Sequence, residues 1–248
     1  MNERKFLPIG KLFPNLITLM GLFCGLTSLK YTFVGKWELS LIFITIAAFL
    51  DGMDGRIARL LHSTSNFGAH LDSLADFFNF GVAPALLLYF WHLQTIHVYG
   101  WVMVMLFIVC VVLRLARFNT TIGDQTAQDR IKSKFMVGVP APVGALLSLV
   151  PLMLSMNDNP FLVYANFVVD NILYYLLIIS MLVISRIPTL SIKKIRVPPN
   201  LVSFVMLIFG ILMVALLTKP WVTLIIMCIF YIISIPITTF MYFYLQRR

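Results

Sequence analysis

The sequence predicts an all-α polytopic membrane protein, a bundle of about eight transmembrane helices. Of its 248 residues, 60% are hydrophobic and only 12% are charged, whereas a soluble domain carries about 25% charged residues. Apolar runs long enough to cross a hydrocarbon layer of roughly 30 Å recur along the chain. A closed β-barrel would instead show short segments of alternating hydrophobicity. The composition therefore indicates membrane-spanning helices.

The predicted helices follow from the apolar runs and from the polar or proline-containing breaks between them. The eight spans lie at about 14–33, 37–60, 71–92, 98–117, 137–156, 161–185, 200–218 and 220–245. We expect a single domain over 1–248, in which 14–185 forms a six-helix core. Residues 200–248 form a C-terminal helical hairpin after the break at "RVPPN". Residues 1–13 mix basic and bulky apolar groups and are expected to lie along the membrane interface.

The distribution of Lys and Arg supports this number of spans. With the N-terminus in the cytoplasm, all but three of the 19 Lys and Arg residues fall on the cytoplasmic side, the exceptions being Lys30, Lys36 and Lys219. Such an asymmetry follows the positive-inside rule and places both termini in the cytoplasm. The net charge of +9 is then explained by topology, and we expect no nucleic-acid partner.

Four of the ten acidic residues lie between positions 51 and 76, in or beside the second and third spans. An Asp at the centre of a membrane helix costs roughly 2.5–3.5 kcal/mol on insertion scales. Asp51 and Asp54 are three positions apart, and Asp72 and Asp76 are four apart, so each pair shares one helix face. The connection between the spans is short, which predicts antiparallel helices whose acidic faces meet at the cytoplasmic end.

Small and basic residues accompany the acidic ones. Gly55, Ala58 and Gly68 lie near the same faces and allow a backbone or a ligand to approach closely. Four carboxylates in one place stay ionised together only beside cations, and oxygen ligands suit Mg²⁺, Mn²⁺ or Ca²⁺. Two such ions can clamp a phosphoryl group, and Arg56 and Arg59 are suited to bind phosphate. Ion pairing of the acids with nearby arginines is the alternative, but it does not explain the small residues.

The two acidic segments resemble the signature of the CDP-alcohol phosphatidyltransferase family. "DGMDGRIAR" (51–59) is followed after eight residues by "GAHLDSLAD" (68–76), and all eight signature positions match. The resemblance implies a six-helix membrane core with a site that faces the cytoplasm. It also implies transfer of a phosphatidyl group from a CDP-linked lipid to an alcohol, with release of CMP. The implied cofactors are two divalent cations, Mg²⁺ or Mn²⁺.

The resemblance also implies roles for individual residues. Asp51, Asp54 and Asp72 would be metal ligands, and Asp76 would be the general base with a further metal contact. The residues that would bind the CDP-lipid are Gly55, Ala58, Arg59 and Gly68, with Asn15 and Thr18 as additional candidates. Asn15 and Thr18 also fit the simpler interpretation of a helix that begins at the "PN" step.

Flanking segments resemble the branch of this family whose acceptor is L-serine. These segments are "PNLITLMGLFCG" (14–25), "FGAHLDSLADFFNFGVAPA" (67–85), "LRLARFN" (113–119) and "GVPAPVGA" (138–145), in the last of which Val139 stands where Leu is expected. The resemblance implies CDP-diacylglycerol and L-serine as substrates and a homodimer among membrane lipids. The location it implies is the cytoplasmic membrane of a prokaryote.

The carboxylate of serine calls for a cationic partner. Arg114, Arg117 and Asn119 at the cytoplasmic end of the fourth span are the candidates, and topology with lipid-headgroup contact is their alternative role. The aromatic stretch "FFNF" (77–80) is interpreted as core or lipid-facing.

Other functions stay open at this point. The same chemistry could use glycerol 3-phosphate, inositol or choline as the acceptor. A divalent-cation transporter is a more distant alternative, which predicts acidic residues throughout the membrane depth and an internal repeat. Direct transfer and a covalent aspartyl intermediate are not distinguished by the residues.

Overall fold

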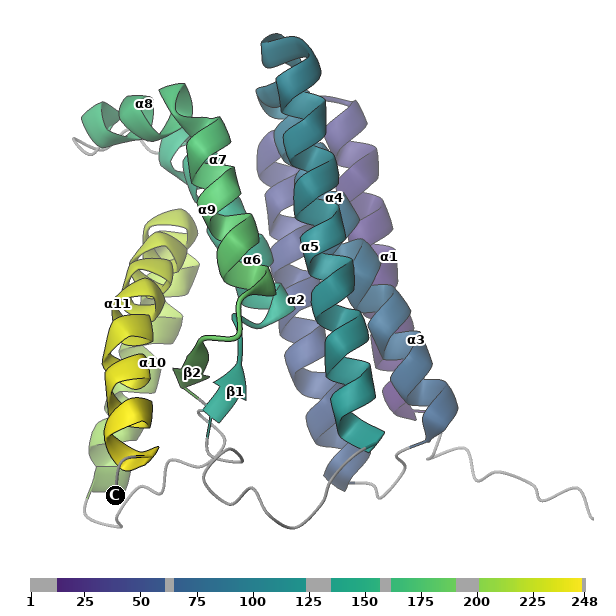
Figure 1. Cartoon of the computed structure of the whole chain (residues 1–248), viewed down its shortest axis with the longest axis vertical. Helices are drawn as coiled ribbons and strands as arrows, with labels where there is room; N and C mark the ends of the chain where they lie inside the picture. Colours follow the sequence, from purple (N-terminus) through teal and green to yellow (C-terminus); the bar gives the residue numbers. More distant parts are fainter. Residues whose placement is uncertain (1–12, 61–64, 124–134, 157–161, 191–200, 247–248) are drawn as a thin grey trace, which may run out of the picture. The chain divides into compact units, whose positions relative to one another are not determined.

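The computed structural model consists almost entirely of helices (Figure 1). It describes residues 13–60, 65–123, 135–156, 162–190 and 201–246. The predicted interfacial segment therefore lies, except for its last residue, outside the described residues. The chain folds as two compact units, Met1–Leu115 and Ala116–Arg248.

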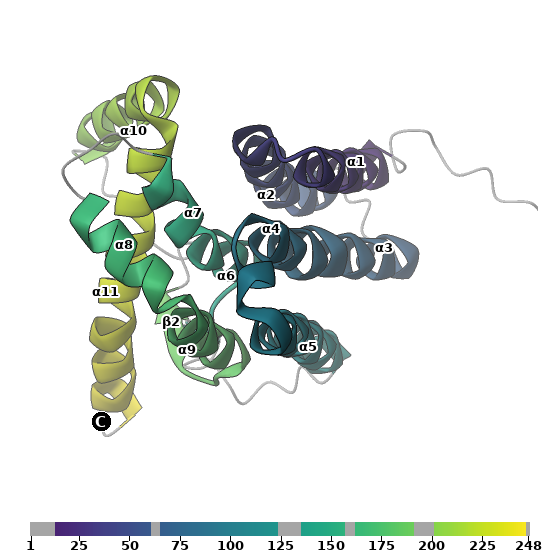
Figure 2. The same ribbon diagram turned by 90° about the horizontal axis from the view of Figure 1, so that it is seen from above.

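The first unit is a group of helices around one long central rod. Its elements are α1 (Phe13–Phe33), α2 (Trp37–Leu60), α3 (Asn66–Asp76), the π-helix η2 (Phe77–Val82), α4 (Ala83–Trp91), the 3₁₀ helix η3 (Leu93–Ile96) and α5 (His97–Gly123) as far as Leu115. The elements α3, η2 and α4 follow one another without a gap and form the rod. Figures 1 and 2 show the rod between the α1–α2 pair and α5.

A tight turn and a buried hydroxyl cluster join α1 to α2. Gly35 adopts a left-handed φ of +72°, and its amide donates to the Thr32 carbonyl at 3.0 Å, which ends α1. Inside the pair, the Ser40 hydroxyl lies 2.7 Å from that of Ser28 and 2.8 Å from that of Thr32. All three side chains are buried. These bonds fix how α1 and α2 are aligned along their length.

The second unit contains the last residues of α5 and the helices that follow it in the chain. These are α6 (Ala141–Ser148), α7 (Val150–Ser155), α8 (Leu162–Asp170), α9 (Ile172–Ile184), α10 (Val202–Thr218) and α11 (Pro220–Gln246). Helix α9 packs against α6, and α10 and α11 form the predicted C-terminal pair. The Arg117 guanidinium donates to the Ile184 carbonyl at 2.9 Å, at the end of α9.

One short β-pair departs from the all-α prediction. Strand β1 (Phe135–Val137) pairs antiparallel with β2 (Pro188–Leu190). The strands lie where the chain enters α6 and where it leaves α9, so the packing of these helices brings the two segments side by side. Gly138 has a φ of +78°, and its amide donates to the Ile187 carbonyl at 2.9 Å. Pairing satisfies backbone groups that would otherwise lack partners.

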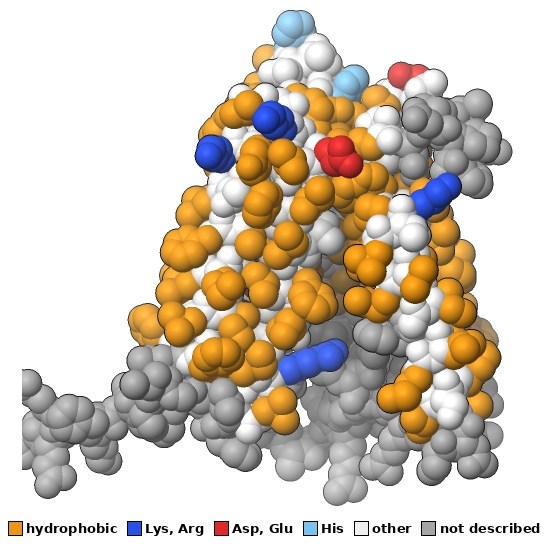
Figure 3. Space-filling model, turned by 180° about the vertical axis from the view of Figure 1, so that it is seen from behind, with side chains coloured by type: hydrophobic (Ala, Val, Ile, Leu, Met, Phe, Trp, Pro, Cys, Tyr) orange, Lys and Arg blue, Asp and Glu red, His pale blue; other side chains and the backbone are white. Residues whose placement is uncertain are grey.

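Four of the described helical segments are long and apolar enough to cross a membrane, by length and composition. They are Phe13–Phe33, Asn66–Trp91, Leu93–Thr120 and Pro220–Met241. Figure 3 shows one face of the molecule, on which hydrophobic side chains predominate and charged ones are few. These features indicate a helical membrane protein, although the predicted number of eight spans is not reached by this criterion.

Two predicted spans are interrupted helices. The span 137–156 breaks between α6 and α7, where Pro151 has no N–H to donate to the Leu147 carbonyl. The Tyr175 hydroxyl of α9 donates to that carbonyl instead, at 2.6 Å. The span 161–185 breaks at Asn171, whose backbone is not helical and whose side chain donates to the Phe167 carbonyl at 2.9 Å. A side-chain hydrogen bond thus replaces the helical one at the first break, whereas at the second it adds to the backbone bond from the Asn171 N–H to the same Phe167 carbonyl, 3.2 Å long.

The hydroxyl cluster between α1 and α2 leads to a stability prediction. Ser40→Ala removes the two hydrogen bonds that Ser40 makes to α1, each worth about 0.6 kcal/mol in membrane proteins. We expect the free energy of unfolding in detergent to fall by about 1 kcal/mol. The matched control is Ser180→Ala, because the buried Ser180 hydroxyl donates to the Leu176 carbonyl of its own helix. Equal losses in the two variants would contradict this account.

Candidate active site

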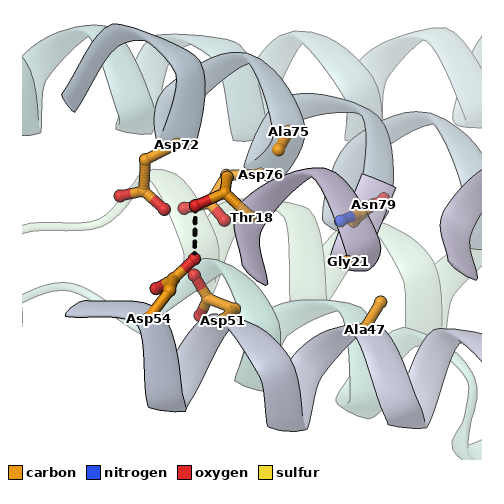
Figure 4. Close-up of a pocket in the computed structure, with 9 residues that line it drawn as sticks. All are labelled: Thr18, Gly21, Ala47, Asp51, Asp54, Asp72, Ala75, Asp76 and Asn79. Atoms are coloured by element: carbon orange, nitrogen blue, oxygen red, sulfur yellow. Dashed lines mark hydrogen bonds between the residues drawn. The ribbon is translucent and has the colours of Figure 1, made fainter. Parts of the chain in front are cut away.

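A hollow between α1, α2 and the α3–η2 rod gathers the acidic residues. Its volume is about 180 Å³, part of which is open to solvent. Figure 4 shows the residues that line it, namely Thr18, Gly21, Ala47, Asp51, Asp54, Asp72, Ala75, Asp76 and Asn79. All of them belong to the first unit. The structure therefore brings the four aspartates of the sequence motif into one pocket.

The carboxylates lie close enough to share a cation. One carboxylate oxygen from each of Asp51, Asp72 and Asp76 lies within 4.8 Å of the others, and all three residues are half-buried. The side chains of Asp51 and Asp76 are in hydrogen-bond contact, which two ionised carboxylates cannot make without a proton or a cation between them. Among the nine lining residues, none is Lys or Arg. This set of oxygen donors fits a hard divalent cation.

Thr18 holds the fourth carboxylate in place. Asp54 is 5% exposed, and its Oδ2 accepts a hydrogen bond of 2.8 Å from the Thr18 hydroxyl (Figure 4). Its Oδ1 accepts from the amide of Gly55, the next residue of α2. The side chain of Asp54 is therefore fixed from α1 and from its own helix.

The entry to α3 is shaped by a cap and a glycine. Ser65 is the N-cap of α3, and its hydroxyl accepts from the Gly68 amide at 3.0 Å. An ideal Cβ on Gly68 would lie only 2.8 Å from Asn15 Oδ1. The first turn of α3 thus packs against the start of α1. By contrast, no described heavy atom lies within 4 Å of an ideal Cβ on Gly52 or Gly55.

The residues predicted to contact the CDP-lipid differ in exposure and in their distance from the pocket. Gly55 is exposed beside the pocket, whereas the side chains of Ala58 and Arg59 lie outside the described part of the chain. Asn15 lies against Gly68, and Thr18 lines the pocket as the partner of Asp54. Sequence reasoning suggested Thr18 as a nucleotide contact and gave no sign of its bond to Asp54.

The predicted acceptor-binding residues are not part of this pocket lining. Arg114 is half-buried in the first unit and does not belong to the nine lining residues. Arg117 and Asn119 belong to the second unit, where Arg117 donates to the end of α9. Their role in binding the acceptor stays a prediction.

Sequence reasoning missed one polar residue of the pocket. Asn79 was included in a stretch interpreted as core or lipid-facing, and both Asn79 and Phe80 are buried, but the interpretation did not foresee that Asn79 lines the pocket. Its side chain lines the pocket and is 3% exposed. Its position three residues after Asp76, and thus near the same helix face, was the available signal.

Comparison with protein families gives two matches. Residues 11–184 match the family model described as CDP-alcohol phosphatidyltransferase. Residues 200–236 match a second model, described as CDP-alcohol phosphatidyltransferase 2. The first match includes every residue of the pocket.

Curated relatives cover most of the chain. It is 37% identical over 230 residues to a CDP-diacylglycerol–serine O-phosphatidyltransferase of Mycobacterium leprae, covering 91% of this chain and 74% of the relative. The enzyme of the same name from Mycobacterium tuberculosis is 36% identical over 91% of this chain and 77% of its own length. That of Helicobacter pylori is 32% identical over 75% of this chain and 74% of its own length.

The bond between Thr18 and Asp54 leads to a test of the cation site. Thr18→Val keeps the shape of the side chain but removes a hydrogen bond to a carboxylate. Groups that orient metal ligands typically contribute about 10–100-fold in metal affinity, so we expect Mn²⁺ affinity, measured by calorimetry, to fall at least about 10-fold. The matched control is Thr27→Val, because the Thr27 hydroxyl donates to a carbonyl of α1 itself. Unchanged affinity in Thr18→Val would show that this bond does not serve a metal site.

Proposed function

The chain belongs to the CDP-alcohol phosphatidyltransferase family, and on that premise we propose that it transfers the phosphatidyl group of CDP-diacylglycerol to the hydroxyl of L-serine. The products would be phosphatidylserine and CMP. The observation that carries this proposal is the meeting of the four signature aspartates in one pocket. The names of the relatives support serine as the acceptor.

We propose that the pocket holds two divalent cations, Mg²⁺ or Mn²⁺. Asp51, Asp54, Asp72 and Asp76 would be the ligands, and the carboxylate oxygens with no basic side chain in the lining support this. Bound cations would neutralise the negative charge of the pyrophosphate and of the departing CMP. Thr18 would keep Asp54 oriented toward the cations.

The residues of the chain would then act on the two substrates as follows. Asp76 would take the proton of the serine hydroxyl while the hydroxyl oxygen attacks the phosphorus that bears diacylglycerol. The bond from this phosphorus to CMP would break, and CMP would leave with the electron pair. Gly55 and Ala58 would leave room for the nucleotide, and Arg59 would bind the pyrophosphate.

We further propose that both units act as one transferase domain with eight spans and cytoplasmic termini. The asymmetric distribution of Lys and Arg supports this topology. The matched ranges 11–184 and 200–236 agree with a six-helix core followed by a C-terminal pair. The aspartate pocket would face the cytoplasm, where serine is available and CMP is released. A homodimer, and acceptor binding by Arg114, Arg117 and Asn119, are further proposals from the family resemblance.

The activity is tested with purified protein in detergent. CDP-diacylglycerol and Mn²⁺ or Mg²⁺ are supplied with serine, glycerol 3-phosphate, inositol or choline in parallel, and CMP release is measured. We expect release that depends on serine and stops when EDTA removes the cations. Release that depends on glycerol 3-phosphate but not on serine would contradict the proposed acceptor, and release by untreated and EDTA-treated protein alike would contradict the cation site.

The role of Asp76 is tested by Asp76→Asn. A general base typically contributes about 10²–10⁴-fold to the rate, so we expect kcat to fall by at least about 100-fold. Binding of CDP-diacylglycerol and of Mn²⁺ should largely remain, because Asp51, Asp54 and Asp72 are proposed as the main metal ligands and Asp76 only as a further contact. The control is Asp170→Asn at the end of α8, which should leave kcat unchanged. Loss of Mn²⁺ binding together with activity would show that Asp76 acts through the cations, and would contradict its role as the base.

Two glycines of α2 provide a matched pair for nucleotide binding. Gly52 and Gly55 both have open space where a Cβ would lie, so Ala at either position should fold and gain about 1 kcal/mol in helix propensity. We expect Gly55→Ala to raise the KM for CDP-diacylglycerol several-fold, because the new methyl group would meet the nucleotide. Gly52→Ala should leave this KM unchanged. Equal KM values in the two variants would argue against a nucleotide contact at Gly55.

A further inference from the structure

Asn79 carries a polar atom that the protein itself does not satisfy. The side chain is 3% exposed, and its Oδ1 is buried without a hydrogen-bond partner. A buried carbonyl oxygen of this kind is unfavourable and calls for an explanation. Figure 4 shows the amide beside Gly21, with its nitrogen on the side of the carboxylates. The side chain therefore lines the acidic pocket with its nitrogen toward the carboxylates, while Oδ1 lies on the side of Gly25.

The helices around Asn79 are built to accommodate its amide. The π-helix η2 begins at Phe77, directly after Asp76, and short π-helical turns occur frequently at functional sites. On α1, an ideal Cβ at Gly25 would lie 2.0 Å from Asn79 Oδ1, and one at Gly21 would lie 3.6 Å from Nδ2. The amide thus occupies space that exists because α1 has glycine at position 25, whereas a Cβ at position 21 would make only an ordinary contact with it.

The position of Asn79 in the pocket restricts which part of a substrate it can meet. Asn79 lies further along the rod from the start of α3 than Asp76 does. Gly55 and Gly68, which are proposed to lie near the nucleotide, are at the opposite end of the aspartate cluster in α2 and α3. The end of the pocket at Asn79 would therefore hold the phosphorus under attack and the acceptor, and not the cytidine.

The chemistry of the unsatisfied atom distinguishes the two substrates at this end. A partner for Oδ1 must bring an N–H or O–H group. The polar part of diacylglycerol offers ester and phosphate oxygens, which are acceptors. L-serine brings an ammonium group and a hydroxyl, which are donors. Rotation of the amide about χ2, a torsion with two broad minima, would turn Oδ1 toward the carboxylates and toward a cationic group bound between them.

We infer that the Asn79 amide binds the α-ammonium group of the acceptor and so positions the acceptor hydroxyl at Asp76. This inference rests on the proposed function. Asp76 and Asn79 both line the same pocket, so the hydroxyl and ammonium groups of one serine would reach both side chains. Asn79 is thus a positioning residue that favours amino alcohols as acceptors.

The test is Asn79→Leu, which keeps the side-chain size and removes both ends of the amide. KM for serine and KM for CDP-diacylglycerol are measured separately, together with the melting temperature. We expect KM for serine to rise about 10-fold or more, the loss expected for a hydrogen bond to a charged group. KM for CDP-diacylglycerol should change less than about two-fold. Asn171→Leu is the matched control, because the Asn171 amide donates to the Phe167 carbonyl of α8 and not to the pocket. Both KM values should stay unchanged in this variant.

A substrate lacking the ammonium group makes the test independent of folding. 3-Hydroxypropionate is serine without its amino group, and the wild type should prefer serine over it by about 10-fold or more in kcat/KM. In Asn79→Leu this preference should largely disappear. A preserved preference, or a rise in KM for CDP-diacylglycerol instead, would overturn the inference. Absence of serine-dependent CMP release in the wild type would instead contradict the proposed function itself.

Discussion

The repulsion among four carboxylates in one pocket is the constraint on which the rest of the site depends. Asp51, Asp72 and Asp76 each place one carboxylate oxygen within 4.8 Å of the others in a half-buried pocket, and the described lining supplies no basic side chain. Like charges at such separations are tolerated only when a proton or a cation lies between them. A protein that kept this arrangement without a cation would lose stability and gain nothing from it. The arrangement is therefore best understood as a cation site.

Helix α1 completes the site that α2 and the rod begin. It supplies Thr18 to Asp54, and its glycine at position 25 leaves room for Asn79. The hydroxyl cluster around Ser40 aligns α1 with α2 along their length. This alignment brings Thr18 level with Asp54. Helix packing far from the carboxylates thus determines how the carboxylates are held.

The sequence allowed part of this to be predicted, because helix periodicity is a local property. Spacings of three and four residues placed each aspartate pair on one face, and the short connection predicted that the faces would meet. Contacts between distant positions could not be predicted in this way. Thr18 and Asp54 are 36 positions apart, and the break before Pro151 is stabilised by Tyr175 from another helix. The π-helix around Asn79 likewise has no signature in residue spacing.

Direct binding of Mn²⁺ tests the central claim that the aspartate pocket is a divalent-cation site. Electron paramagnetic resonance measures free and bound Mn²⁺ during titration of the purified protein in detergent. The account predicts saturable binding by the wild type that is lost in Asp51→Asn and Asp72→Asn and kept in a variant at a distant carboxylate, Asp170→Asn. Saturable binding that survives in Asp51→Asn and Asp72→Asn, or no binding by the wild type, would contradict it.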